Sequence, residues 1–578
     1  MESSKKMTRK WDRVSGRAFI FFSVSAFLFA SFLINKSLGI RRDQTLAHHA
    51  YPLSHPIIKN ACTTTLYPSL CFTVLASVPS ADNFTTFHHF LEKTINQTVK
   101  YVASNHQNIK GLSTRQDLNL QEKNALRDCL EMLEQTLYEL REAIEDLHDY
   151  HASKAYFNGP NGNLKTLLSA AMTNQNTCVD GVLELEEFDS ENQKGIKDHL
   201  QDLLSPTTQM MSNCLGVINY METKTQQEIL NDREISITKI PKNGFPVWMT
   251  PGERNLMQKT PNMMPNIIVA NDGSGDYETI GEALEMAPNR SKKRFVIKIK
   301  AGIYIENLEI NREKTNIMLV GDGMNLTIIT GSRSFADGFS TFTSATLTVT
   351  GDKFLAMDLT IKNTAGGRKF QAVAARVTSN SAFYRCNFVS YQDTLYAHSL
   401  RQFYRECTIQ GTIDFIFGNA AAVFQNCLII VRKPIPGQTN MITAQGRTDP
   451  NQNTGISLQN CTILAAPNFK VSDRKKFTTF LGRPWRNYSR TMVMKSYLGD
   501  VIDPQGWCKW DEYSTVDTVD YIEHLNYGPG SDTKNRVTWG GYRSNCSERV
   551  ARKFTVGFFL HGAGDWLEST GFPLFYGS

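Results

Sequence analysis

Apolar residues follow a helical spacing in the first part of the chain. Between residues 54 and 222 they recur at intervals of three and four, most clearly in the stretch LRDCLEMLEQTLYELREAIEDLH. Further segments with this spacing lie around 164–172 and 196–217. Such a period is typical of amphipathic α-helices. We therefore predict an antiparallel helical bundle over residues 54–222, with core positions that include Leu130, Leu133, Leu137, Leu140 and Ile144.

From residue 266 the pattern changes to short β-prone runs. The runs NIIVA, RFVIKI, NIMLVG, LTIIT and ATLTVT are separated by Gly, Asn and Asp residues. Short runs bounded by such turn residues are typical of β-strands. Many of them follow one another, so this part of the chain is predicted to be a β domain.

One fixed interval organises the polar residues of this β domain. Three pairs of like residues lie 21 positions apart, namely Gln371 and Gln392, Asp393 and Asp414, and Cys386 and Cys407. A constant period indicates stacked coils. Equivalent positions in successive coils stack about 4.8 Å apart. A parallel β-helix is therefore favoured over a sandwich, and it places two carboxylates side by side with two amides next to them.

The N-terminus carries a targeting segment. An apolar run, residues 18–34, follows six basic residues. It is either a cleaved signal peptide or a short membrane anchor, and both direct the chain into the secretory pathway with the remainder in the lumen. Seven N-x-S/T glycosylation sequons fit this route: Asn83, Asn96, Asn289, Asn325, Asn460, Asn487 and Asn545.

Composition completes the domain plan. With 578 residues, 41% hydrophobic and 20% charged, the chain is long enough for two folded domains. Polar residues, Pro and Gly replace the apolar pattern between the two parts. The predicted division is a basic N-terminus with its apolar run (1–53), a helical bundle (54–222), a linker (223–262) and a β-helix domain (263–578).

The two halves of the chain carry opposite net charge. Residues 51–261 hold 18 Lys and Arg against 25 Asp and Glu, a net charge of −7. Residues 262–578 hold 35 against 28, a net charge of +7. The halves are expected to attract each other, although two independent surfaces of opposite sign would give the same count.

Cysteine pairs are expected because the predicted compartment is oxidising. In the helical part we predict disulfides Cys62–Cys71 and Cys129–Cys178, with Cys214 left over, although spacing alone allows other pairings. In the β domain, Cys407–Cys427 is the first choice because 20 residues make one coil, and Cys427–Cys461 competes with it. Cys508 and Cys546 have no obvious partners.

The stacked acids allow two chemistries. A retaining glycosidase also needs two carboxyl groups about 5 Å apart. The neighbouring Gln371 and Gln392 favour acyl transfer instead, because uncharged amide donors stabilise the oxyanion formed when a carboxylate attacks an ester. The sequence has no Gly-x-Ser-x-Gly elbow, and its His residues do not cluster at metal-binding spacing. No metal or cofactor is therefore expected.

The β domain resembles the plant pectin methylesterases. The similarity lies in GIYIE (302–306), QAVAAR (371–376), YQDTLY (391–396), DFIFGNA (414–420), AQGRTDPNQNTG (444–455) and LGRPW (481–485), and it covers nearly all of residues 263–578. The resemblance implies a right-handed parallel β-helix with a cleft for pectin, which is methyl-esterified homogalacturonan.

The resemblance also implies roles for individual residues. Asp414 would attack the ester carbonyl, Asp393 would act as acid and then base, and Arg483 would orient ionised Asp414. Gln371 and Gln392 would form the oxyanion hole. Two carboxylates this close cannot both ionise easily, and an arginine beside one of them decides which keeps its proton. Sugar contacts are expected from Thr341 and Trp485, and from aromatic side chains that stack on pyranose rings, namely Tyr396 and Trp507, with Phe342 and Phe417 equally compatible with core packing.

The helical part resembles the plant invertase and pectin methylesterase inhibitor family. The similarity lies in Ala61–Cys71, LRDC (126–129) and TNQNTC (173–178). It implies a four-helix bundle that acts as an inhibitory or chaperone-like pro-region. Related precursors carry a dibasic-Leu-Leu processing motif, and the matching site here reads Arg254-Asn255-Leu256-Met257.

Together these features predict a secreted or membrane-anchored cell-wall esterase that acts on pectin, contacts its own helical domain and binds no nucleic acid. Two alternatives are a polygalacturonase-like glycosidase, whose Asp-rich signatures are not seen, and a non-catalytic inhibitor of other esterases. The second alternative would lack one of Asp393, Asp414 or Arg483, and all three are present.

Overall fold

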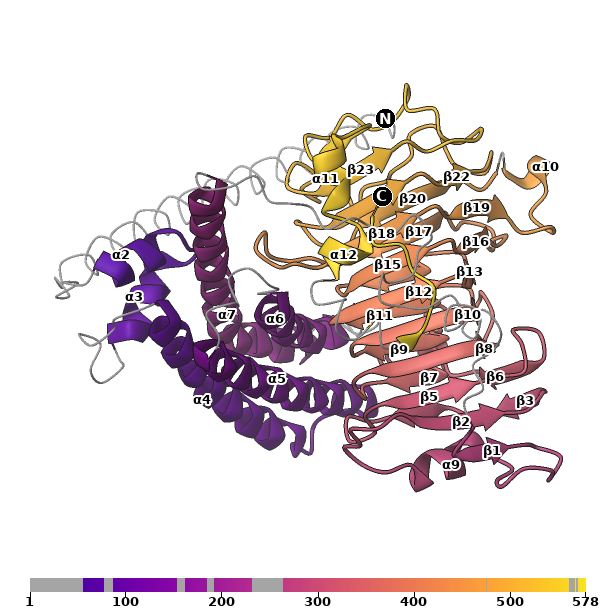
Figure 1. The fold of residues 1–578 in the computed structure, drawn as a ribbon, viewed down its shortest axis with the longest axis horizontal. Coiled ribbons are helices and arrows are strands. Elements are labelled where there is room, and N and C mark those ends of the chain that lie inside the picture. The colour runs from indigo at the N-terminus through magenta and orange to yellow at the C-terminus, as the bar shows by residue number, and fades with distance from the viewer. Residues whose placement is uncertain are drawn as a thin grey trace, which may run out of the picture.

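A computed structural model describes two bodies of the chain (Figure 1). The helical body comprises residues 56–76, 87–152, 162–183 and 192–230. The β body comprises residues 264–577 except 475, 561–566 and 568–569. The targeting run at 18–34, the sequon at Asn83 and the processing site at 254–257 lie outside the described residues. Within the described residues, no helix is long and apolar enough to cross a membrane.

Four long helices form the bundle that the spacing predicted. They are α4 (Phe87–Ser113), α5 (Leu120–Ala152), α6 (Gly162–Leu183) and α7 (Asn192–Leu230). α5 packs between α4 and α6, and α7 closes the bundle against α4 and α6. The predicted linker was placed too early, because α7 continues to Leu230. Helical propensity in METKTQQEIL was overlooked once the apolar stripe had ended.

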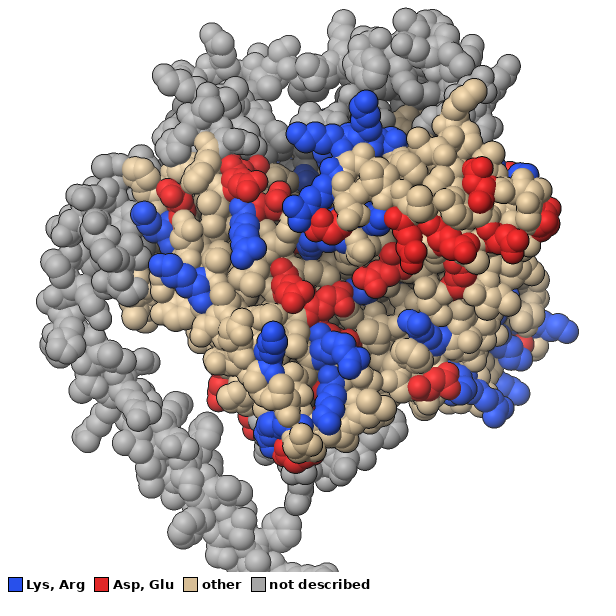
Figure 2. Space-filling model, turned by 90° about the horizontal axis from the view of Figure 1, so that it is seen from below, with Lys and Arg blue, Asp and Glu red and all other residues tan. Residues whose placement is uncertain are grey.

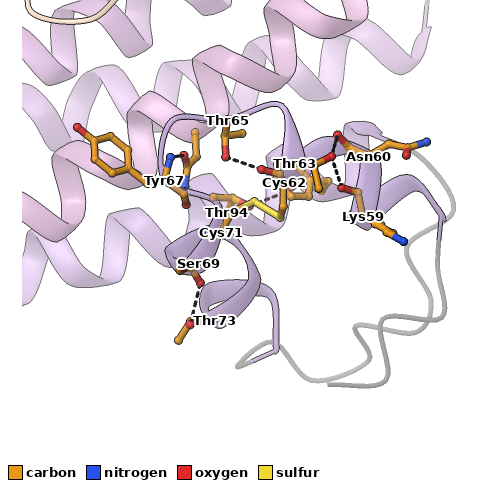
Figure 3. The surroundings of a disulfide bond; sticks show 12 residues. Lys59, Asn60, Cys62, Thr63, Thr65, Tyr67, Ser69, Cys71, Thr73 and Thr94 are labelled. Atoms are coloured by element: carbon orange, nitrogen blue, oxygen red, sulfur yellow. Dashed lines mark hydrogen bonds between the residues drawn. A yellow bond between two sulfur atoms is a disulfide. The ribbon is translucent and has the colours of Figure 1, made fainter. Parts of the chain in front are cut away.

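A short helical hairpin precedes the bundle. It consists of α2 (Pro56–Thr63) and α3 (Pro68–Ala76), which the Cys62–Cys71 disulfide joins (Figure 3). The Asn213 side chain of α7 accepts from the Tyr67 N–H at 3.1 Å and donates to the Tyr67 carbonyl at 2.9 Å. A second disulfide, Cys129–Cys178, joins α5 to α6. Both bonds are the pairs expected from the sequence.

All paired strands of the β body are parallel. One sheet has the order β20-β17-β14-β11-β9-β7-β4. Its strands are β4 (Leu308–Ile310), β7 (Leu347–Val349), β9 (Ala375–Thr378), β11 (Leu395–Ser399), β14 (Ile416–Gly418), β17 (Asn440–Gln445) and β20 (Thr479–Pro484). This sheet carries the candidate site.

The remaining strands form the second sheet system and complete each coil. They are β1 (Ile267–Val269), β2 (Phe295–Ile299), β3 (Gly302–Ile305), β5 (Ile317–Val320), β6 (Thr327–Gly331), β8 (Phe354–Asn363), β10 (Ser381–Val389), β12 (Arg401–Arg405), β13 (Thr408–Gly411), β15 (Ala421–Gln425), β16 (Leu428–Val431), β18 (Gly455–Gln459), β19 (Thr462–Ala465), β21 (Arg490–Met494), β22 (Tyr497–Leu498), β23 (Asp520–His524) and β24 (Tyr542–Arg543).

Short helices cover parts of this β-helix. They are α9 (Ile280–Met286), the 3₁₀ turn η3 (Phe335–Asp337), α10 (Val471–Arg474), α11 (Glu548–Arg552) and α12 (Val556–Phe559). Inside the coils, Tyr404 stacks between Phe383 and Phe424, with ring centroids 5.1 and 4.5 Å apart. Like residues therefore stack through the core, as a coil repeat requires.

The cysteine ladder corrects one prediction. Cys386, Cys407, Cys427 and Cys461 lie buried in successive coils, and all four are free thiols. The predicted Cys407–Cys427 disulfide was wrong, and its competitor Cys427–Cys461 is not formed either. Each of the last three thiols lies 3.4 to 3.5 Å from a carbonyl oxygen of the preceding coil, so the sulfur atoms point along the stack in parallel. A disulfide needs side chains that converge.

Candidate active site

The two candidate acids occupy equivalent positions in neighbouring coils. Leu395 of β11 pairs with Ile416 of β14, and this register of 21 residues sets Asp393 opposite Asp414. Both acids are buried, and both have left-handed backbones, with φ of 61° and 49°. Non-glycine residues rarely adopt this conformation, and such strain concentrates at functional sites. Each acid therefore stands at a turn that directs its side chain away from the regular strand.

The two glutamines also stack. Gln371 and Gln392 form an isolated parallel bridge immediately before β9 and β11. Both side chains line the same cavity as the two acids. Four of the side chains singled out by their 21-residue interval therefore lie together.

Arg483 holds Asp414 by two hydrogen bonds. Its Nε donates to Oδ1 at 2.9 Å and its Nη2 donates to Oδ2 at 2.5 Å. Burial raises the pKa of Asp414, and the Arg483 guanidinium acts in the opposite direction. The Asp414 carboxylate in turn raises the pKa of Arg483, so the guanidinium keeps its charge. Asp414 is thus fixed in position by a bidentate ion pair.

Aromatic side chains line the cavity, which has a volume of about 370 Å³. Tyr396 stacks on Phe417 with centroids 4.2 Å apart, and Trp485 lies 6.4 Å from Trp510 at an angle of 27°. The Trp485 ring packs over Gly446, where a Cβ atom would lie only 2.8 Å from the indole. Thr341 and Phe342 line the cavity as well.

Trp507 does not belong to this wall, so its predicted sugar contact was wrong. Its side chain is 0% exposed, and its indole N–H donates to Glu523 at 3.2 Å inside the coil. Trp510 lines the cavity instead, and the Arg483 guanidinium lies 3.9 Å from its ring. The sequence stretch WCKW contained both tryptophans. Only the turn of the backbone between them decides which one faces outward.

Residues of the helical bundle also line the cavity. They are Asp128 of α5 and Thr177, Asp180 and Gly181 of α6. Ser340 donates to the Asp128 carboxylate at 2.6 Å, and Asp180 pairs with Arg486. The sequence analysis missed these residues.

A loop of the β-helix, residues 448–453, forms a second contact with the bundle. Its partners on α6 and α7 are reached by side-chain hydrogen bonds of 2.5 to 3.3 Å: Thr448 with Asn176, Asp449 with Ser212, Asn451 with Asn219, Gln452 with the Ser169 carbonyl, and Asn453 with Thr166. The bundle is therefore docked over the cavity and beside it, as Figure 1 shows for α5 and α6.

Glycosylation sequons and metal ligands were also examined by position. Five sequon asparagines are exposed, namely Asn289, Asn325, Asn460, Asn487 and Asn545, and Asn96 is half-buried on α4. Within the described parts of the chain, no group of three or more His, Cys, Asp or Glu side chains could hold a metal ion.

Known families match both bodies of the chain. The family model described as pectinesterase matches residues 266–563, and the model described as plant invertase/pectin methylesterase inhibitor matches residues 56–217. The chain is 47% identical over 528 residues to pectinesterase 1 of Citrus sinensis, which covers 90% of this chain and 89% of that protein. It is 46% identical over 533 residues to pectinesterase/pectinesterase inhibitor U1 of Solanum lycopersicum, which covers 91% and 89%.

A solved structure matches the β-helix. The pectin methylesterase from carrot is 53% identical, with a TM-score of 0.54, and the match covers 55% of this chain and 99% of that one. The resemblance inferred from the sequence motifs is confirmed. The chain belongs to the plant pectinesterase family, in the group that carries an N-terminal pectin methylesterase inhibitor domain.

Proposed function

We propose that this protein hydrolyses the methyl esters of homogalacturonan and releases pectate and methanol. The observation that carries the proposal is the single cavity in which Asp393, Asp414 and the stacked glutamines meet. Aromatic walls suit the apolar faces of sugar rings. Membership of the pectinesterase family supports the same reaction.

In the proposed mechanism Asp414, aligned by Arg483, attacks the C6 carbonyl carbon of a methyl galacturonate. The negative charge that develops on the carbonyl oxygen is held by the amide N–H groups of Gln371 and Gln392. Asp393 gives its proton to the departing methoxy group, which leaves as methanol. Asp393 then takes a proton from water, and the resulting hydroxide attacks the acyl-enzyme to release the free acid and regenerate Asp414.

A purified fragment, residues 263–578, is expected to release methanol from esterified pectin without added metal or cofactor. The carboxyl groups and amides of the cavity supply every proton transfer and the oxyanion stabilisation. Methanol and pectin chain length would be measured together, with and without a chelator. Loss of activity with the chelator would contradict this mechanism. Chain shortening would favour the glycosidase alternative instead.

We also propose that the chain is secreted to the cell wall, with its precursor retained on the membrane if residues 18–34 are not removed. The exposed sequon asparagines support passage through the secretory pathway. Cleavage in the segment 231–263 would separate the helical bundle from the β-helix.

The helical bundle is proposed to keep the precursor inactive, because α5 and α6 cover the cavity and leave no path for a polymer. Its contact with the β-helix rests on buried pairs more than on long-range attraction. Arg312 donates to Glu139 at 2.9 Å, and the Glu139 side chain is 2% exposed. Figure 2 shows Lys and Arg interspersed with Asp and Glu on the face seen from below. Salt should therefore weaken closure only partly, since buried pairs are screened less than exposed ones.

Closure is expected to be tighter in acid. Burial raises the pKa of Asp128 to about 6 despite Ser340 and Arg376 beside it, and burial also raises the pKa values of Glu139, which faces Arg312, and Asp180. When the bundle leaves, these carboxyls return to an ordinary pKa of about 4. A pKa raised in the closed form adds stability that is complete below about pH 4 and is lost as the pH rises through about 6.

The measurement compares methanol release by the full chain and by residues 263–578 at about pH 5 and about pH 7.5. The full chain should be more strongly inhibited at the lower pH. Asp128→Asn should reduce this pH dependence, whereas Asp117→Asn, at an exposed pair with Arg115, should leave it unchanged. Equal activity of the full chain and the fragment at every pH would contradict autoinhibition.

A further inference from the structure

Two arginines flank the acid pair along the length of the β-helix. Asp414 and Asp393 precede β14 and β11, in the middle of the seven-stranded sheet. Arg486 follows β20 at one end of this sheet, and Arg312 follows β4 at the other end. Strands lie about 4.8 Å apart, so β20 and β4 are separated by about 29 Å. The two guanidiniums therefore stand on opposite sides of the reacting groups.

Each of these arginines is paired with a carboxylate of the helical bundle. Arg486 pairs with Asp180, whose side chain is 15% exposed, and Arg312 pairs with Glu139, which is 2% exposed. Within the described chain, the ion pairs of both arginines are made with α6 and α5 and not with the β-helix. Burying a carboxylate is unfavourable unless it is paired in good geometry.

Their surroundings suit a sugar carboxylate as well. Arg486 lines the active-site cavity, and its guanidinium lies 5.3 Å from the ring of Trp485, which also lines it. The Arg312 guanidinium lies 4.0 Å from the ring of Tyr138, a residue of α5 that leaves together with the bundle. Removal of the bundle therefore exposes a charged guanidinium at each end of the cleft. A guanidinium binds a carboxylate in a planar, two-point arrangement.

We propose that Arg486 and Arg312 are binding sites for carboxylates of unesterified galacturonate residues on either side of the ester being hydrolysed. In the full chain, Asp180 and Glu139 occupy these sites and stand in for the polymer's own carboxylates. The inference rests on the proposed esterase function and specifies its substrate as partly de-esterified pectin. Because hydrolysis creates new carboxylates, the enzyme would favour esters next to its earlier products.

The test uses residues 263–578, since the carrot enzyme that matches this part is itself a chain of that extent. Methanol release from esterified pectin would be measured with an unesterified galacturonate oligomer, long enough to reach both arginines, as competitor. Arg486→Gln and Arg312→Gln should each weaken inhibition by the oligomer about tenfold, as expected for the loss of a charge-assisted contact. Both should lower, by a similar factor, the preference for partly over fully esterified pectin.

Arg543→Gln is the matched control, because this arginine pairs with Asp520 on the other sheet and should change neither quantity. Arg486→Lys keeps the charge and should retain most of the oligomer binding, which a role in folding alone would not require. If the oligomer inhibits both Gln variants as strongly as the unsubstituted fragment, the arginines serve domain docking alone and the inference is overturned. If the unsubstituted fragment releases no methanol, the proposed esterase function itself fails.

Discussion

Asp414→Asn is expected to abolish methanol release. An amide cannot attack the ester carbonyl, so no acyl-enzyme forms and activity should fall at least about 10³-fold. Initial rates of methanol release and mass spectrometry of the trapped enzyme would measure both effects. The change also leaves the Arg483 guanidinium without its charged partner, so the unfolding temperature should decrease, since breaking a buried pair costs about 3–5 kcal/mol.

Asp473→Asn is a suitable control for this variant. Asp473 pairs with Lys433 on α10, outside the cavity, and its loss should leave the rate unchanged. A variant at Asp414 that remains folded and still turns over pectin at a comparable rate would rule out Asp414 as the nucleophile.

Asp393→Asn should reduce turnover by about 10² or more without preventing attack. Asp414 remains aligned by Arg483, but methanol must leave without a proton donor, and water lacks a base. An aryl ester that fits the cleft has a leaving group that needs no protonation. With such a substrate, this variant should show a burst of phenol equal to the enzyme concentration, followed by slow release.

The same substrate separates the two acids. If the burst appears in Asp414→Asn and is absent from Asp393→Asn, the two roles are reversed. If neither variant gives a burst while both remain folded, covalent catalysis is not the route.

The sequence predicted the β-helix because some coils contain no insertions. The 21-residue interval is the true register between β10 and β12 and between β11 and β14. Elsewhere the register is 27 residues, between β8 and β10, or 34 residues, between β15 and β18, because loops interrupt the coils. Periodicity is therefore visible only around the acid pair, and the other strands had to be inferred from composition.

The site was predictable to the same extent. The acids and glutamines repeat with the coil, and Arg483 entered through the family motif. Arg486, Trp510 and the carboxylates of α5 and α6 could not be found in this way. Asp180 and Arg486 are 306 positions apart, and no local pattern encodes a contact between two domains. The oxidation state of the cysteine ladder was equally hidden, because spacing gives stacking but not the direction of the sulfur atoms.

The loop at 448–453 has a consequence for the fate of the separated enzyme. Its contacts with α6 and α7 are made by hydroxyl, amide and carboxylate groups. Water can replace every one of these partners at little cost in free energy. Departure of the bundle therefore uncovers a wettable rim rather than a broad greasy surface, which would promote aggregation. The β-helix should remain monodisperse in a cell wall crowded with polysaccharide, where no chaperone is at hand to rescue it.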